Sequence, residues 1–385
     1  MADKLKEFIA DSKTLIGKDA PDVPQGLKVA DWTSVERFCA ALGDINPLYN
    51  DTAGGVGTLY NTMIAPPTFI LAARTPDSGG AYEKKNYGLR RFSISASAEW
   101  NDVIRLADRL AGDLKITSVD NGGQLGGRDT AEVKSAATYR DVSGGVLATA
   151  TGTVAMVPFE QGRPLILDRD IHQYSEAEIR QLETDLDAIP PHRGSLPRYW
   201  SEVQEGDKLP TLVKGPVSYN EISTWNLAEA KSPRASIGAV AHQMVMERPG
   251  RQTMNPSTLW PYFDWEQSYG DILSIGAIGF KMPVSQGLMR FALTGQIITN
   301  WMGDLGFLRS MSLDLPNHFC YQDTMWVSGE VVKKYREQVG SAEYYAVEVK
   351  LTAKNQLGEP LVDGTAVAYL PEKGFLVGLP VGNPW

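Results

Sequence analysis

The chain has 385 residues, of which 43% are hydrophobic and 22% charged, a composition typical of a soluble globular protein with one large domain or two ordinary ones. Its formal net charge of −9 argues against nucleic acid or an anionic membrane as the main partner, and it leaves room for a local basic patch. The first segment, "MADKLKEFIADSKTLIG", predicts an amphipathic helix without a secretion signal, and nothing approaches the roughly 18 apolar residues of a membrane span. We therefore expect a cytoplasmic protein in which Cys39 and Cys320 are buried thiols.

The segment "WTSVERFCAALGD" predicts a helix. Thr33 and Glu36 have the spacing of a capping box at its start. Apolar residues recur on one helical face, at Val35, Phe38 and Leu42.

A polar turn follows this helix in "LGDINPLYND". Gly43 fits the helix stop, and Pro47 should hold the following loop rigid. Asp44, Asn46 and Tyr49 are then expected on an ordered turn, where their side chains can converge on a ligand. The alternative is an ordinary turn, because Gly, Asp, Asn and Pro are the usual turn residues.

Two parts of the chain resemble each other at nearly constant spacing. The strand-like "GGVLATATGTVAMVP" resembles "GEPLVDGTAVAYLP", "ADRLAGDLKITSV" resembles "QDTMWVSGEVVKK", and "MIAPPTFILAAR" resembles "FKMPVSQGLMRF". Offsets this consistent indicate an internal repeat. The matched pairs are Pro158 with Pro371, Asp108 with Asp323, and Pro67 with Pro283, at offsets of 213, 215 and 216 residues.

The starts of the two halves match with a smaller offset, since Trp225 follows Phe38 by 187 residues. The difference from 216 implies an insertion of about 29 residues in the second half, in the Pro-, Trp- and Tyr-rich region 244–271. This insertion is either a lid or substrate wall, or a packed part of the core. We expect a first domain at 1–165, a linker with a short capped helix at 166–195, and a second domain at 196–385.

The segments "FCAALGDINPLYND", "APPTF" and "VAMVP" together resemble the MaoC-like hydratase/dehydratase family. The first half is similar to a FAS1-like dehydratase domain. The second half, with "RYWSEVQEGDKLPTLVKGPVS", "NWMGDLGF" and "GTAVAYLP", is similar to the second domain of two-domain acyl dehydratases. The resemblance implies an α+β double hotdog, in which an antiparallel sheet wraps round central helices.

Hydratases of this family carry the motif G-D-x-N-P-x-H. Gly43, Asp44, Asn46 and Pro47 match it, and Tyr49 stands in place of the His. The resemblance implies that Asp44 is the acid–base carboxylate and that Asn46 orients it. A phenol has a pKa of about 10, so Tyr49 is expected to donate a hydrogen bond or to act as a general acid rather than as a base.

The equivalent stretch of the second half, "LAEAKSPRAS", has Lys231 opposite Asp44 and Pro233 opposite Asn46, so it lacks both the Asp and the His. Another residue must then supply an imidazole or a second carboxyl group. His242, in an apolar run, and Asp264, in the aromatic insertion, are the candidates. A structural His and a solvated loop carboxylate are the alternatives for these two residues.

The substrate carbonyl should be held by backbone amides at the start of a central helix, as the resemblance implies. The candidates are the amides near Pro67 and Thr68 in the first half and near Gly287 in the second. Arg290 could meet a carboxylate or phosphate of the substrate, or could form a structural ion pair. His172 and His192, which flank the linker helix, are expected to be exposed.

The leading functional hypothesis is a hydratase/dehydratase acting on an acyl thioester, either a CoA ester or an acyl-carrier thioester. One alternative is a non-catalytic subunit that binds thioesters or completes a partner's active site, and another is different lyase or thioesterase chemistry in the same tunnel. Metal, nucleotide and redox motifs are absent from the sequence, so no cofactor is expected beyond the CoA of the substrate. Hotdog domains commonly pair through their sheets, so a homodimer is possible.

Overall fold

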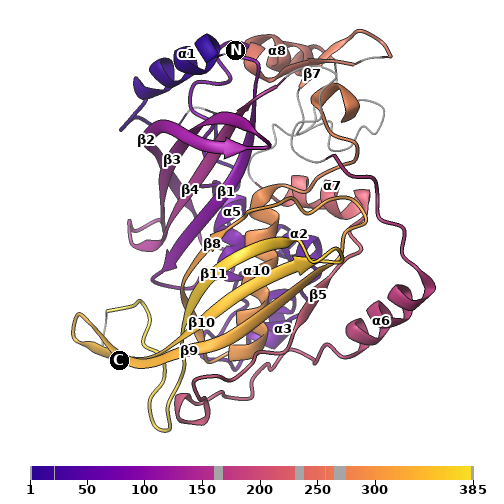
Figure 1. Ribbon diagram of the computed structural model, residues 1–385. Coiled ribbons are helices and arrows are strands. Elements are labelled where there is room, and N and C mark those ends of the chain that lie inside the picture. The colour runs from indigo at the N-terminus through magenta and orange to yellow at the C-terminus, as the bar shows by residue number, and fades with distance from the viewer. Residues whose placement is uncertain are drawn as a thin grey trace.

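The structure, a computed structural model, describes residues 2–20, 22–159, 168–229, 238–255, 257–263 and 275–382. Its main sheet has nine strands in the order β2-β3-β4-β1-β8-β11-β10-β9-β5. The order β2-β3-β4-β1 of the first half is repeated in reverse by β8-β11-β10-β9 of the second, and antiparallel β1 and β8 meet at the centre. The predicted double hotdog is therefore confirmed, with two similar halves related by an approximate twofold axis (Figure 1).

The first half builds its strands from alternating segments, and their inward residues are buried at every second position. Its strands are β1 (Leu89–Trp100), β2 (Ala111–Leu125), β3 (Arg128–Arg140) and β4 (Val146–Pro158). Its helices are α1 (Ala2–Lys13), α2 (Trp32–Leu42), α3 (Pro47–Asn50), α4 (Thr52–Gly55), η1 (Pro67–Phe69) and α5 (Ile70–Ala73).

The second half follows a linker that contains α6 (Glu176–Asp187) and runs along one side of the molecule (Figure 1). Its sheet strands are β5 (Leu212–Lys214), β8 (Phe307–Asp314), β9 (Met325–Val339), β10 (Ala342–Asn355) and β11 (Pro360–Tyr369). Its remaining elements are η2 (Trp200–Glu202), α7 (Tyr219–Ala228), α8 (Ala239–Glu247), η3 (Pro249–Arg251), β6 (Gln252–Met254), β7 (Pro261–Phe263), η4 (Ile275–Ile278) and α10 (Gly287–Met302). The exact domain boundaries remain predictions.

The internal repeat appears in matching hydrogen bonds. Asp108 accepts from the Arg105 amide at 2.8 Å, and Asp323 accepts from the Cys320 amide at 2.9 Å, both at the predicted offset of 215. The predicted match of Pro67 with Pro283 was wrong by one helical turn. The central helices begin at Pro67 and Gly287, an offset of 220 (287 − 67), because the second half has extra residues before its helix.

Helix α10 is the central element of the fold. Nearly all its residues are buried, and it packs against β1, β8, β9, β11 and η1. A helix buried on all sides must be apolar all round, as "GLMRFALTGQIITNWM" mostly is. The ring centroids of Phe38 on α2 and Trp225 on α7 are 5.6 Å apart. The two residues that the internal repeat matched are therefore in contact across the approximate twofold axis.

Helix α2 begins two residues earlier than the predicted capping box suggested. Its N-cap is Asp31, whose Oδ1 accepts from the Ser34 amide at 3.0 Å, so the prediction that Thr33 caps the helix was wrong. Asp31→Ala should therefore lower the free energy of unfolding by about 1 kcal/mol, whereas Thr33→Ala should leave it nearly unchanged. Urea titration of both variants checks this, and equal losses would contradict the assignment.

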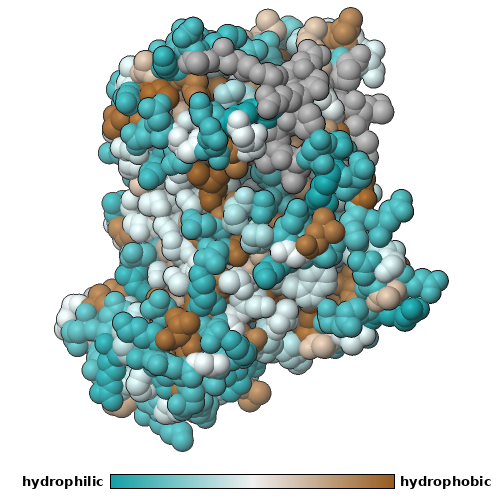
Figure 2. All heavy atoms as spheres, viewed as in Figure 1, coloured by the Kyte–Doolittle hydropathy of each residue, from teal (hydrophilic) through white to brown (hydrophobic). Residues whose placement is uncertain are grey.

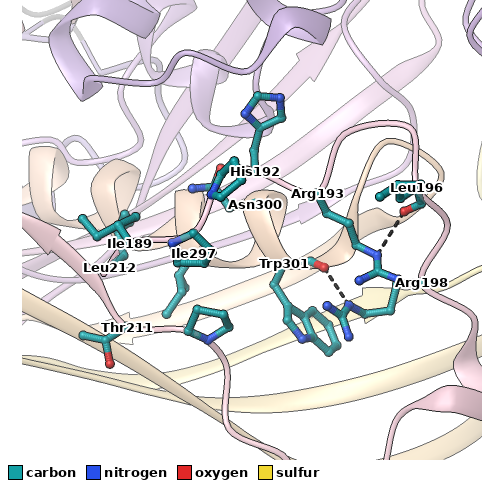
Figure 3. Close-up of a pocket in the computed structure, with 13 residues that line it drawn as sticks. Ile189, His192, Arg193, Leu196, Arg198, Thr211, Leu212, Ile297, Asn300 and Trp301 are labelled. Carbon is teal, nitrogen blue, oxygen red and sulfur yellow. Dashed lines mark hydrogen bonds between the residues drawn. The ribbon is translucent and has the colours of Figure 1, made fainter. Parts of the chain in front are cut away.

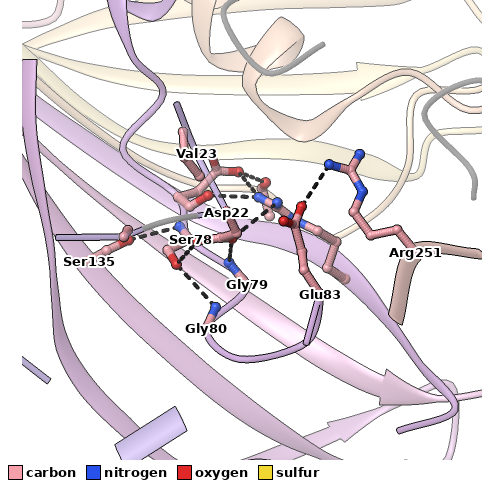
Figure 4. Close-up of polar contacts among 12 residues, drawn as sticks. Asp22, Val23, Ser78, Gly79, Gly80, Glu83, Ser135 and Arg251 are labelled. Atoms are coloured by element: carbon pink, nitrogen blue, oxygen red, sulfur yellow. Dashed lines mark hydrogen bonds and ion pairs between the residues drawn. The ribbon is translucent and has the colours of Figure 1, made fainter. Parts of the chain in front are cut away.

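The second-half insertion lies against the first half. Glu83 pairs with Arg251 at 2.8 Å and with Arg248 at 3.2 Å. A buried polar network lies beside these pairs: Asp22 accepts from the Ser78 hydroxyl at 2.6 Å and from the Gly79 amide at 2.6 Å (Figure 4). These contacts are structural, and they favour the packed alternative over a lid or substrate wall for this part of the insertion.

No helix among the described residues is long and apolar enough to cross a membrane. The face seen in Figure 2 is largely hydrophilic, with apolar residues in small separate groups.

Candidate active site

The motif turn holds itself in shape. Helix α2 ends at Gly43, whose φ of 59° is the left-handed value that glycine adopts easily. Asp44 Oδ1 then accepts from the Asn46 amide at 3.0 Å, and Asn46 Oδ1 accepts from the Leu48 amide at 3.1 Å to cap α3. The Asn50 side chain donates to the Asp44 carbonyl at 2.9 Å. The predicted ordered turn is thus present.

The Asp44 side chain faces the middle of α10. It is only 4% exposed and lines a cavity of about 10 Å³ together with Thr68, Gln296 and Thr299. The Gln296 side chain donates to the Gly43 carbonyl at 3.4 Å. The carboxyl group therefore sits between the two halves, in a space that is borderline for one water molecule.

Lys214 of β5 contacts the C-terminal end of α2. Its Nζ donates to the Leu42 carbonyl at 2.6 Å, and burial lowers its pKa to about 8. Burial raises the pKa of Asp44, and the nearby Lys214 and His192 partly oppose this increase. A carboxyl group with a raised pKa is suited to proton transfer near neutral pH.

A second carboxyl group approaches the turn from the end of α10. The Asn46 side chain lies within hydrogen-bonding reach of the Asp304 carboxylate and lowers its pKa, and Tyr60 donates to the Asp304 carbonyl at 3.3 Å. Burial is the larger influence and raises the pKa of Asp304, while His192 again opposes it. Asp304 Oδ1 is buried and has no hydrogen-bond partner among the described residues.

Tyr49 lines the same cavity as Asp304. It is 3% exposed, and burial together with the Asp44 charge raises its pKa well above that of a free phenol. A phenol with a raised pKa stays protonated, so Tyr49 can donate a hydrogen bond and is a poor base; its role remains a prediction. It lines a cavity of about 20 Å³ with Tyr60 and Asp304, enough room for a water molecule.

The linker brings an imidazole to this region. His192 is partly buried and lines a cavity of about 280 Å³ with Leu212, Asn300 and Trp301 (Figure 3). The Asp304 amide donates to the carbonyl of Gly194, two residues after His192, at 2.9 Å, and the charge of His192 opposes the rise in the pKa of both Asp44 and Asp304. The expectation that His192 is exposed was wrong, since the linker packs on α10 instead of running free.

Together these residues form a composite site, named here the Asp44 site. It consists of Asp44, Asn46, Tyr49, Tyr60, His192, Lys214 and Asp304. Each carboxyl group can take or give a proton, the phenols of Tyr49 and Tyr60 can donate hydrogen bonds, and the imidazole can do both. The arrangement is suited to general acid–base chemistry in a water-poor environment.

Comparison with known proteins supports the resemblance. Residues 28–149 match the family described as FAS1-like, dehydratase domain region. A UPF0336 protein of Streptomyces avermitilis is 27% identical over 137 residues, which cover 33% of this chain and 84% of that protein. The matched part is the first half, which contains the motif turn.

Solved structures match almost the whole chain. A structure described as a MaoC-like dehydratase has a TM-score of 0.58 at 16% identity and covers 93% of this chain and 99% of its own. The chain has the double hotdog fold of the MaoC-like dehydratases. A putative MaoC domain dehydratase from Chloroflexus aurantiacus agrees, with a TM-score of 0.53 at 12% identity and coverage of 94% and 99%. At sequence identities of 16% and 12%, the similarity to these structures shows the fold alone.

Of the two helix starts predicted to hold the substrate carbonyl, only the one at Pro67 and Thr68 lies beside Asp44. Pro67 and Thr68 line the same small cavity as the Asp44 carboxyl group. Gly287 lies nine residues before Gln296, roughly 14 Å along α10. A Cβ at Gly287 would approach Ser93 Cβ to 2.8 Å, so close packing explains this glycine.

Arg290 is buried and donates to the Asn317 carbonyl and, at 3.1 Å, to that of Leu361. These bonds tie α10 to the strands and favour the structural interpretation. His242 lies exposed on α8, with its ring 5.7 Å from that of Trp260. Helix α8 lies at the top of Figure 1 and α3, which follows Asp44, lies well below it, so the structure does not bring His242 to Asp44. Asp264, Lys231 and Pro233 lie outside the described residues.

Sequence reasoning missed the roles of His192, Lys214 and Asp304. Asp304 resembled an ordinary residue at a helix end, and Lys214 lies in a three-residue strand without a motif. Each reaches the motif turn only through the packing of the two halves. Among the described residues no cluster of His, Cys, Asp or Glu could hold a metal ion.

Proposed function

We propose that this protein is a hydratase/dehydratase that adds water to a 2-enoyl thioester, or removes it from a 3-hydroxyacyl thioester, with CoA as the preferred carrier. The observation that carries the proposal is a pair of carboxyl groups, the buried Asp44 and the half-buried Asp304, which come from different halves and both contact Asn46. The FAS1-like dehydratase region and the MaoC-like fold support the same reaction class.

In the hydration direction, the water oxygen bonds to C3 as the π-electron pair of C2=C3 moves to C2 and the thioester carbonyl. The Asp44 carboxylate takes one water proton, and the site returns one proton to C2, so the sum is the addition of H₂O. Asn46 holds the carboxyl groups in place, and the Tyr49 hydroxyl donates a hydrogen bond to the water. A donor near Thr68 polarises the thioester carbonyl, which stabilises the developing negative charge.

The first test is the loss of enoyl-thioester absorbance with short, long and aromatic 2-enoyl-CoA substrates. The proposal expects turnover of at least one of them, and the reverse reaction with the matching 3-hydroxyacyl-CoA. Enoyl-pantetheine and enoyl-carrier-protein versions of the best substrate identify the carrier. No turnover in either direction, by a folded protein, would contradict the proposal.

A non-catalytic role is the second candidate, and one observation favours it. The cavities that touch Asp44 and Tyr49 measure only about 10 and 20 Å³, far less than an acyl chain needs. On this alternative the chain binds thioesters or completes a partner's site. Calorimetric binding of a saturated acyl-CoA without turnover of the enoyl-CoA would favour this alternative.

A further inference from the structure

The linker is fastened to the end of α10 at several points. The Arg193 amide donates to the Asn300 carbonyl at 3.1 Å, and the Asp304 amide donates to the Gly194 carbonyl at 2.9 Å. Gly303, with a φ of 75°, lets the linker pack closely, since a Cβ there would lie 3.1 Å from the Gly194 oxygen. These contacts hold the residues that follow His192 against the C-terminal end of α10, beside Asp304.

The His192 side chain is placed for proton exchange rather than for structural bonding. Its ring points away from Trp301 and toward the first half, and it borders the cavity of about 280 Å³ (Figure 3). Among the described residues its ring nitrogens have no hydrogen-bond partner, whereas His172, at the other end of the linker helix, bonds Glu178 at 3.1 Å. Arg193 and Arg198, its basic neighbours, donate to the Leu196 and Trp301 carbonyls instead.

We infer that His192 is the acid–base imidazole of the Asp44 site, supplied by the linker in place of the His that the motif turn lacks. This inference rests on the proposed function. When water adds to C3 and Asp44 takes its proton, the His192 imidazolium gives a proton to C2, which completes the C–H bond. The proton on Asp44 then passes to the neutral imidazole, and both groups return to their starting state.

The pH dependence of the hydration rate should reflect the charges around Asp44 and His192. Asp44 is the base, so activity should fall as pH decreases through its raised pKa. His192 lowers the pKa of Asp44, so its removal should move this acid limb to higher pH. The other titratable or charged groups that face the pair are Cys39, Tyr49, Lys214, Arg193, Arg198 and Asp304.

The test compares His192→Gln and His192→Gly with native protein, using the best enoyl-CoA substrate. We expect kcat/KM of His192→Gln to fall by about 100-fold or more, with its acid limb at higher pH. Added imidazole should restore part of the activity of His192→Gly, because the linker cavity has room for it. His172→Gln is the matched control, and its activity and pH profile should equal those of the native protein.

The outcomes separate this inference from the proposed function. If the native protein turns over no enoyl thioester, the proposed function fails and the inference fails with it. If the native protein is active and Asp44→Asn is not, but His192→Gln keeps native activity, only the inference fails. A loss of activity in His192→Gln with an unmoved acid limb and no imidazole rescue would indicate a structural role and would also overturn it.

Discussion

Asp44→Asn should lower kcat/KM for enoyl-thioester hydration by about 10²–10⁴-fold, because an amide cannot take the proton that water loses. The turn should survive, since an Asn side chain keeps the oxygen that accepts from the Asn46 amide. The measurement is the pH–rate profile of the native protein and the variant. The native acid limb should lie above the ordinary aspartate pKa of about 3.9, as burial raises the pKa of Asp44.

The same variant should be more stable than the native protein at neutral pH. A carboxyl group whose pKa is raised on folding opposes folding once it ionises, so the cost of Asp44 is present above its folded pKa and vanishes below the unfolded value of about 3.9. Asp51→Asn, at an exposed cap one turn further on, is the control and should change neither activity nor pH profile. A variant that is inactive and unfolded would leave the catalytic assignment without support.

Arg91→Met should lower the free energy of unfolding by about 3–5 kcal/mol, because it leaves buried carboxylates without their cation. Arg91 is 2% exposed and lies 3.4 Å from Asp77 and 3.8 Å from Asp22, and it donates to the Asp77 carbonyl at 2.7 Å. Denaturant titration at several pH values is the measurement. The loss should shrink as pH falls, since burial raises the pKa of Asp22 and Arg91 opposes this.

The control for Arg91 is Arg180→Met. Arg180 pairs with Glu176 at 3.3 Å on the linker helix, where both side chains are mostly exposed. Exposed pairs of this kind contribute little, so the unfolding midpoint should not change measurably. Similar midpoints for Arg91→Met and the native protein would show that the buried network does not hold the first half together.

The fold was predictable from the sequence because its signals are local and repeated. Alternating strands, the helix stop at Gly43 and the pairing of Phe38 with Trp225 each depend on short segments, and the structure contains all of them. The match of Pro67 with Pro283 failed because both prolines precede apolar helices, and a proline alone does not specify how far away the helix starts. The backbone bridge of Ile64 to Arg105 corresponds to that of Val284 to Cys320, and this pair gives the same offset of 220 (284 − 64) as the helix starts.

The site was predictable only where one turn carries it. Asp44, Asn46 and Tyr49 follow from their spacing, and their turn braces itself by local hydrogen bonds. Asp304 and His192 reach that turn from far along the chain, through the packing of α10 and the linker. His242 was the candidate imidazole in the sequence, but α8 places it far from α3 and the motif turn (Figure 1).

The central claim is that chemistry occurs between the two halves at Asp44. The most direct test is a crystal structure of the Asp44→Asn variant with a 2-enoyl-CoA bound. The account predicts C3 of the acyl group about 3–3.5 Å from a water or side chain at position 44, with Asp304 and His192 beside it. An acyl group bound elsewhere, with its C2=C3 bond away from position 44, would contradict it.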